Sequence, residues 1–274
     1  MSTANWFVTG VSRGFGKTFC EELLQRGFHV VGTTRNGTSD IDHQNLTVIP
    51  LDVTDEAQTE SAIKQAITQL GRIDVVVNNA GFGMVGAVEE VSLQEARATF
   101  DTNFFGTLNV IRAVVPHLRT NRGGHIVNFS SVGGITGSAG YGIYNAAKFA
   151  VEGLSEALDL ELKPFGVKVL IVEPGYFRTD FLAPGSMKKA ARVVDAYAET
   201  AGVARSNASA RSGSQPGDPA KAVRVIIKAV ESPTPPLRLP LGPDCYARID
   251  DKLARLKRDM DAWREIGSAT TFDP

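Results

Sequence analysis

Short apolar runs rich in β-branched residues alternate with longer segments of helical periodicity along most of this chain. Strands of a parallel sheet are buried on both faces and read as such runs, and the helices that connect them cover the sheet. The alternation therefore predicts an α/β fold, with a doubly wound parallel sheet of about seven strands and helices on both faces. The strands are expected at residues 6–8, 28–32, 46–51, 73–77, 125–129, 167–172 and 237–239.

Length and composition favour one domain over two. A chain of 274 residues with 43% hydrophobic residues can bury a large single core. We expect a main domain at 1–243 and a charged, amphipathic helical tail at 244–274. Within the main domain, residues 180–217 are mostly small or polar, and such a weakly patterned stretch in a compact domain predicts a lid over a binding site.

Charge and cysteine content exclude several classes of protein. The formal net charge is −1 and no basic block is present, which argues against nucleic acid or an anionic membrane as the partner and favours a small molecule. Residues 1–10 do not resemble a leader and no apolar run approaches membrane length, so we expect a cytoplasmic protein. Cys20 and Cys245 are far apart and lack metal-ligand spacing, so no metal site or disulfide is expected.

A glycine-rich loop, Thr-Gly-Val-Ser-Arg-Gly-Phe-Gly at 9–16, follows the first expected strand and precedes a helical pattern at 17–25. Glycines allow a tight turn, close approach of backbone to phosphate, and close packing of helix on strand. The helix N-terminus then faces the anion. This context predicts a Rossmann-type dinucleotide-binding loop, although a purely structural glycine turn is the alternative.

The end of the second expected strand bears on the choice of cofactor. An acidic residue there would bind the adenosine ribose, whereas arginine accommodates a 2′-phosphate. Arg35 ends this strand, Arg13 lies in the glycine loop, and the first acid is Asp40. This arrangement favours NADP over NAD, unless both arginines are only solvated surface residues.

Tyr144 and Lys148 are four residues apart in a helical pattern. On a helix such residues lie about 5–6 Å apart at Cβ, so the ammonium is expected beside the phenol. A neighbouring cation would lower the phenol pKa from about 10 and make it usable as an acid or base. Tyr141 has Asn145 at the same spacing, so it lacks the lysine and is expected to be a pocket wall.

Polar residues also follow the fourth and fifth expected strands, at the sheet edge where ligands bind in open α/β sheets. Asn78 and Asn79 precede Ala80 and Gly81, and they could satisfy local backbone groups or hold a cofactor. Ser130-Ser131 could bind a substrate oxygen or cap a turn. The chain has no Gly-x-Ser-x-Gly elbow, which argues against a serine hydrolase.

The helix that carries Tyr144 is apolar on more than one side. Phe149 and Leu160 fall outside its main apolar stripe. Such a helix is covered on more than one side, either by the same chain or by a partner subunit. The main stripe consists of Ala147, Val151, Leu154, Leu158 and Leu162.

Together these motifs resemble the short-chain dehydrogenase/reductase family in its single-domain form. The resemblance covers about residues 5–241, and the glycine spacing separates the chain from the family's extended members. The markers occur in family order: the loop at 9–16, Asn78-Asn79-Ala80-Gly81, Asn103, Ser131, Tyr144 with Lys148, and Pro174-Gly175 with Thr179.

The resemblance implies a role for each catalytic position. Tyr144 would protonate the carbonyl oxygen during reduction and act as the base in the reverse direction. Lys148 would lower the pKa of Tyr144 and bind the nicotinamide ribose. Ser131, rather than Ser130, would hold the reacting oxygen, and Asn103 would anchor a water that links Lys148 to solvent.

The family resemblance also implies which residues hold the cofactor. Asp52 and Val53 would lie by the adenine, Asn79 by the adenosine ribose, and Thr179 by the nicotinamide. The full set of expected cofactor contacts is Gly10, Ser12, Arg13, Gly14, Phe15, Gly16, Arg35, Asp52, Val53, Asn79, Ala80, Gly81, Asn103, Tyr144, Lys148, Pro174, Gly175 and Thr179. The residues Phe82, Met84, Tyr141, Tyr176, Phe177 and Phe181 suggest an apolar substrate pocket, with half of them expected to be core instead.

The sequence thus predicts an NADP(H)-dependent oxidoreductase that interconverts a ketone or aldehyde with an alcohol, acting as a homodimer or homotetramer. The rival hypothesis is a non-catalytic NADP-binding regulatory protein on the same fold. A third hypothesis, a structural module, would bind no nucleotide at all.

Overall fold

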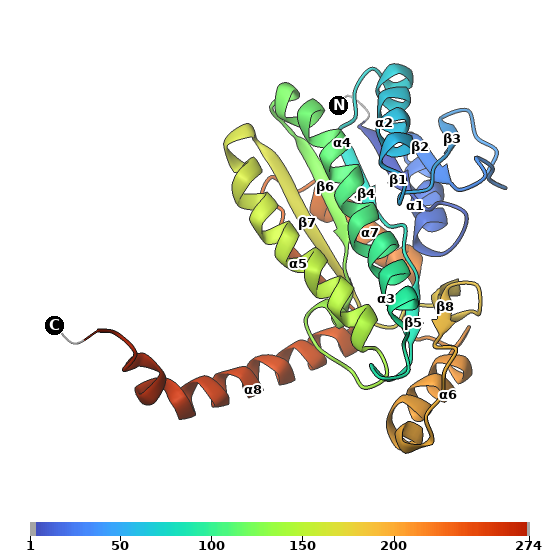
Figure 1. The fold of residues 1–274 in the computed structure, drawn as a ribbon. Helices are drawn as coiled ribbons and strands as arrows, with labels where there is room; N and C mark the ends of the chain where they lie inside the picture. Colours follow the sequence, from blue (N-terminus) through green and yellow to red (C-terminus); the bar gives the residue numbers. More distant parts are fainter. Residues whose placement is uncertain (1–3, 273–274) are drawn as a thin grey trace.

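Seven parallel strands form the centre of the computed structural model, which describes residues 4–272 (Figure 1). Their order is β3-β2-β1-β4-β6-β7-β9, which confirms the expected doubly wound sheet. Ile73 precedes β4 and donates its N–H to His117 Nε2 at 3.1 Å, so β4 starts later than expected. The strands are β1 Asn5–Thr9, β2 His29–Thr34, β3 Leu46–Pro50, β4 Val75–Asn78, β6 Gly124–Phe129, β7 Val167–Pro174 and β9 Arg238–Leu241.

Helices cover both faces of this sheet (Figure 1). On one face α1 (Gly14–Gln25) packs beside α7 (Pro219–Val230). The other face carries α2 (Glu56–Leu70), α4 (Gly106–Asn121) and α5 (Gly142–Leu162). Each face therefore has its own apolar core.

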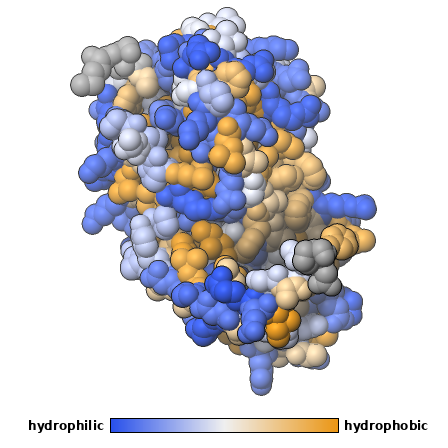
Figure 2. Space-filling view, turned by 90° about the vertical axis from the view of Figure 1, so that its left-hand side faces the viewer, coloured by the Kyte–Doolittle hydropathy of each residue, from blue (hydrophilic) through white to orange (hydrophobic). Residues whose placement is uncertain are grey.

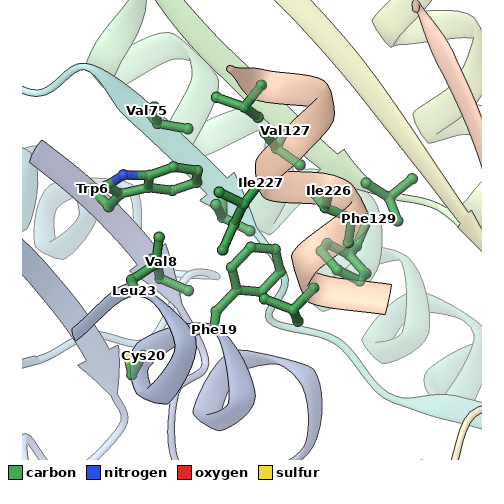
Figure 3. Close-up of a cluster of buried hydrophobic side chains, with 14 of the residues drawn as sticks. Trp6, Val8, Phe19, Cys20, Leu23, Val75, Val127, Phe129, Ile226 and Ile227 are labelled. Atoms are coloured by element: carbon green, nitrogen blue, oxygen red, sulfur yellow. The ribbon is translucent and has the colours of Figure 1, made fainter. Parts of the chain in front are cut away.

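Successive side chains of β1 point alternately into the two cores. Trp6 and Val8 point into the core under α1 and α7, where they meet Phe19 and Ile227 (Figure 3). Phe7, between them, belongs to the core on the opposite face. Burial on both faces fixes β1 at the centre of the sheet, which places the glycine loop that follows it.

Helix starts follow the capping signals in the sequence. The Asp55 carboxylate accepts from the Gln58 N–H at 2.9 Å at the start of α2. Ser92 and Glu95 form a capping box at the start of α3 (Leu93–Phe100). These bonds satisfy N–H groups that a helix leaves free in its first turn.

Residues 180–217 contain regular elements that the sequence pattern did not reveal. β8 (Met187–Lys189) pairs in parallel with β5 (Gly83–Val85), and α6 (Val203–Ala210) follows. A small separate core that includes Val85 and Met187 holds them together. The pattern is weak because this core needs only a few apolar side chains.

The last helix, α8 (Pro243–Ser268), runs away from the body of the molecule (Figure 1). Cys245 is its buried residue, and from Leu253 onward every side chain of the helix is exposed. Among the described residues, no helix has both the length and the apolar character needed to cross a membrane.

Candidate active site

A cleft of about 590 Å³ lies where the strands of the sheet end at their carboxyl termini. The glycine loop, the ends of β4, β6 and β7, and the first turns of α5 line it. Residues far apart in the sequence therefore meet in one place, as expected for ligand binding in an open α/β sheet.

The glycine loop fits a bound dinucleotide. Gly10 and Gly14 have φ values of +74° and +56°, a region that favours glycine. A Cβ on Gly16 would lie 2.2 Å from the Gly10 carbonyl oxygen, so no side chain is tolerated there. The backbone is thus open to close approach of a phosphate, and the N-terminus of α1 begins at Gly14 with no side-chain cap. Ser12 and Phe15 line the cleft beside it.

Asn79 holds this loop in place. Its Nδ2 donates to the carbonyl oxygens of Thr9 at 2.9 Å and Gly10 at 3.1 Å. The Thr9 hydroxyl in turn accepts from the N–H groups of Asn79 and Ala80, each at 3.0 Å. The side chain of Asn79 therefore satisfies local backbone groups, while Asn79, Ala80 and Gly81 all line the cleft.

Asn78 serves the fold and does not line the cleft. Its Nδ2 donates to Asn128 Oδ1 at 2.8 Å, and Asn128 Nδ2 donates to Ser155 Oγ at 2.9 Å. This buried chain of polar groups ties β4 and β6 to α5.

Tyr144 and Lys148 lie in the cleft on α5, with 7% and 6% of their surfaces exposed. The Lys148 Nζ is 6.0 Å from the centroid of the Tyr144 ring. It donates to the Phe129 carbonyl oxygen, at the end of β6, at 2.7 Å. That bond fixes the ammonium between the phenol and the sheet.

Burial shifts both groups toward their neutral forms. It raises the pKa of Tyr144 to about 12, although a hydrogen bond with Ser131 acts in the opposite direction. Burial also lowers the pKa of Lys148 to about 8, and the charge of Glu152 partly opposes this shift. The expected lowering of the phenol pKa is not found, because the loss of hydration outweighs the hydrogen bond with Ser131. At neutral pH Tyr144 is thus a neutral proton donor beside a charged lysine.

The two serines after β6 differ in position. Ser131 is half-buried and its hydroxyl accepts from the Gly133 N–H at 3.0 Å, at the start of a short 3₁₀ turn. Ser130 is buried toward Glu152, since a Cβ placed on Gly134 would meet both side chains. Ser131 is therefore the serine that faces Tyr144.

Asn103 lies in a π-helical turn, Asp101–Phe105, between α3 and α4. Its Nδ2 donates to the carbonyl oxygens of Phe82 and Thr99 at 3.0 Å, and its Oδ1 accepts from the Phe82 N–H at 3.1 Å. One lone pair of Oδ1 remains for another donor. Turns of this kind often occur at functional sites.

The two arginines expected near the adenosine lie on the cleft. Arg13 reaches across it and donates to the Gly185 carbonyl oxygen at 2.9 Å, while Arg35 lines it and is exposed. Asp40 instead pairs with Lys17 at 2.5 Å, outside the set of cleft-lining residues. Arg35 therefore places a positive charge on the cleft wall where β2 ends.

All of the expected cofactor contacts except Gly16 line the cleft. Asp52 accepts from the N–H and hydroxyl of Thr54 at 3.0 and 2.8 Å, and Val53 follows it. Pro174 and Gly175 lie at the end of β7, with Thr179 four residues further on.

Of the six apolar residues expected at the pocket, five line it and Met84 does not. Met84 lies on β5 and is buried. The ring of Phe181 lies 5.7 Å from that of Tyr144, so an aromatic wall stands next to the phenol. Leu182, Met187, Lys188 and Gln215 line the cleft from the segment 180–217, and Arg248 lines it although no motif in the sequence indicated this residue.

Arg248 lies beyond the sheet, in the second turn of α8. It donates to the hydroxyls of Thr136 at 2.7 Å and Ser138 at 2.6 Å. The Asp244 carboxylate accepts from the Tyr176 N–H at 2.9 Å. The start of α8 thus forms part of the cleft wall, and no motif in the sequence indicated this.

Behind Lys148 lies a buried group of charges that the sequence also did not indicate. Arg238 of β9 donates to Glu152 of α5 and, at 3.0 Å, to Glu173 of β7. Both carboxylates are almost fully buried. Burial and the nearby charge of Glu152 together raise the pKa of Glu173 to about 7, although Arg238 opposes the shift.

Comparisons with known proteins agree with this architecture. A family model described as short chain dehydrogenase matches residues 5–190. An oxidoreductase of Botryotinia fuckeliana, BOA17, is 36% identical over 274 residues, which cover 98% of this chain and 99% of that protein. A 3-ketodihydrosphingosine reductase of Bacteroides thetaiotaomicron is 39% identical over 237 residues, covering 86% and 87% of the two chains.

A solved structure extends the agreement to three dimensions. A short-chain dehydrogenase from Streptomyces avermitilis is 38% identical and superposes with a TM-score of 0.92, covering 98% of this chain and 99% of that one. Because the family model spans well over half of the sequence and the relatives match almost end to end, the chain belongs to the short-chain dehydrogenase/reductase family of nicotinamide-dependent oxidoreductases.

Proposed function

We propose that this protein is an NADP(H)-dependent reductase or dehydrogenase that interconverts a ketone or aldehyde with an alcohol. The observation that carries the proposal is the convergence of Tyr144, Ser131 and Lys148 in the cleft that the glycine loop also lines. A proton donor, a hydroxyl for positioning and a buried cation thus surround one point beside a phosphate-binding loop.

A nicotinamide bound in this cleft would supply the hydride in reduction and accept it in oxidation. Ser131 holds the carbonyl oxygen near the phenol, and Tyr144 donates its proton to that oxygen as negative charge develops. Lys148 stabilises the phenolate that results, and Asn103 offers its remaining acceptor site to a water that links the lysine to solvent. In the reverse direction the phenolate takes the proton from the alcohol.

We propose an apolar substrate. Tyr141, Phe82, Tyr176 and Phe181 supply aromatic walls, and Phe181 comes from the segment 180–217, which we propose as the lid. A relative named for a keto compound, 3-ketodihydrosphingosine, supports a lipid-like carbonyl. The test is a panel of long-chain, steroid-like and retinoid-like ketones, aldehydes and alcohols, followed by NADPH absorbance. Tight NADPH binding without turnover of any of them would favour a regulatory protein instead.

NADP is proposed as the preferred cofactor because Arg13 and Arg35 line the cleft and Asp40 is paired with Lys17. We expect NADPH to raise the melting temperature more than NADH. Arg35→Asp should reverse this order, because a carboxylate repels the 2′-phosphate and accepts from ribose hydroxyls. Arg119→Asp, on an exposed helix end outside the cleft, is the control. A larger shift with NADH in the unaltered protein would contradict the assignment.

We also propose a homodimer or homotetramer formed through α5. Phe149 and Leu160 on its outer face are 43% and 71% exposed, so no described element of this chain covers them. The side of the molecule that carries α5 faces the viewer in Figure 2, where hydrophobic side chains form patches among hydrophilic ones. Leu160→Glu should lower the mass measured by light scattering, and Glu161→Gln, a neighbouring exposed change, should not. A monomeric unaltered protein at micromolar concentration would contradict this interface.

A further inference from the structure

The exposed helix α8 carries one continuous apolar stripe. Its members follow one another at alternating intervals of three and four residues, which is the spacing of positions a and d in a heptad. Along a helix of 26 residues, about 39 Å long, the stripe stays on one side. The stripe consists of Tyr246, Ile249, Leu253, Leu256, Met260 and Trp263.

This stripe is open to solvent in the described part of the chain. Leu253, Leu256, Met260 and Trp263 are 55%, 46%, 52% and 66% exposed. A contiguous apolar surface of this kind marks an interaction site in a soluble protein. Helices in proteins gain most of their stability from packing of an apolar face, so we expect a partner to cover the stripe of α8.

We propose that α8 pairs in antiparallel orientation with α8 of a second copy of this chain. Antiparallel pairing joins a positions to d positions, so Leu253 lies opposite the partner's Leu256. The same register places Ile249 opposite the partner's Met260 and Tyr246 opposite the partner's Trp263. Each apolar residue of the stripe thus meets another apolar residue, and the two-fold axis passes between Leu253 and Leu256.

The charges beside the stripe select this orientation. The flanking residues are Asp250 and Lys257 on one edge and Lys252 and Asp259 on the other. In the antiparallel register Lys252 meets the partner's Asp259, and Asp250 meets the partner's Lys257. With the reciprocal contacts, all four flanking pairs are attractive. A parallel pair would instead place Lys252 against the partner's Lys257, which is repulsive, and would keep one attractive type of contact, between Asp259 and the partner's Arg264.

The same charges argue for a second copy over other occupants. The helix contains equal numbers of acidic and basic residues, so it offers no net attraction to an anionic lipid surface. Its charge pattern is complementary to itself. Lys257 already pairs with Asp261 at 2.8 Å within the helix, but both groups are exposed, so exchanging this partner costs little.

The first test removes the apolar contact. A Leu160→Glu background separates α8 pairing from the interface proposed for α5. In that background, Leu256→Asp should abolish the remaining self-association in sedimentation equilibrium, because it places a carboxylate beside the two-fold axis. Ala254→Asp adds the same charge on the other side of the helix and should leave association unchanged. Equal helicity by circular dichroism confirms that both variants keep α8.

The second test exchanges charges. Lys252→Asp and Asp259→Lys should each weaken self-association about tenfold, since each replaces two attractive pairs by two repulsive ones. An equimolar mixture of the two variants should restore the affinity, because both contacts between unlike chains become attractive again. Stronger association of Lys252→Asp alone would show a parallel pair and overturn the proposal. Flotation of the unaltered protein with phosphatidylserine vesicles, without self-association, would overturn it in favour of lipid.

Discussion

Replacing Tyr144 by phenylalanine is expected to lower kcat about a thousandfold while the affinity for NADPH stays nearly unchanged. The phenol is buried, neutral at neutral pH and hydrogen-bonded with Ser131, so its loss removes the proton donor and little else. The phenylalanine ring retains the packing against Phe181. Steady-state rates with a carbonyl from the substrate panel give kcat, and fluorescence titration gives the affinity for NADPH.

Tyr141→Phe is the matched control for that change. Tyr141 lines the same cleft three residues earlier, and burial also raises its pKa to about 12, but no lysine lies four residues beyond it. We expect it to change KM more than kcat. A Tyr144→Phe enzyme with unimpaired kcat would exclude the phenol as the acid and base.

Replacing Arg238 by methionine is expected to lower the free energy of unfolding by about 3 kcal/mol at pH 8. Arg238 binds Glu152 and Glu173, and without it two buried carboxylates face each other unpaired. The loss should be smaller at pH 5. Denaturant unfolding at the two pH values measures both numbers.

The sign of this pH dependence follows from Glu173. Its pKa is raised to about 7, so near pH 5 it is protonated in the folded protein and largely ionised in the unfolded chain. The folded state therefore binds more protons than the unfolded state, and the contribution of Glu173 to stability falls as pH rises through 7. Removing Arg238 makes the ionisation of Glu173 in the folded protein still less favourable.

Two control variants distinguish the loss of stability in Arg238→Met from the effect of removing any positive charge. Arg112→Met breaks an exposed pair with Glu56 and should alter stability little at either pH. Glu173→Gln combined with Arg238→Met should recover part of the loss at pH 8, because one buried carboxylate is gone. Equal destabilisation by Arg238→Met at both pH values would contradict a role for the buried carboxylates.

The parallel sheet and the glycine loop could be predicted because their signals are local. Strands buried on both faces must be apolar throughout. Gly10 and Gly14 have positive φ values, and Gly16 leaves no room for a Cβ. Tyr144 and Lys148 are linked by helical spacing alone. For each of these features, a few consecutive residues carry the whole signal.

Other features depend on contacts that the chain makes only when folded. Glu152, Glu173 and Arg238 come from α5, β7 and β9, and no motif links them. The pKa of Tyr144 is raised mainly by burial, and the spacing of Tyr144 and Lys148 in the sequence does not show how deeply the phenol is buried. Arg248 enters the cleft because α8 starts against β7 and the turn after β6, a matter of tertiary packing.

The contacts at the start of α8 limit how far the chain can be shortened without damage to the cleft. A Cβ on Gly175 would lie 2.3 Å from the Asp244 carboxylate, so the first turn of α8 sits directly against the end of β7. Arg248, one turn later, reaches the cleft wall. A chain cut after the last strand would keep all seven strands yet lose one side of its cleft. We therefore expect the smallest active form to include the first two turns of α8, whereas the remainder of this helix makes no contribution to the cleft wall.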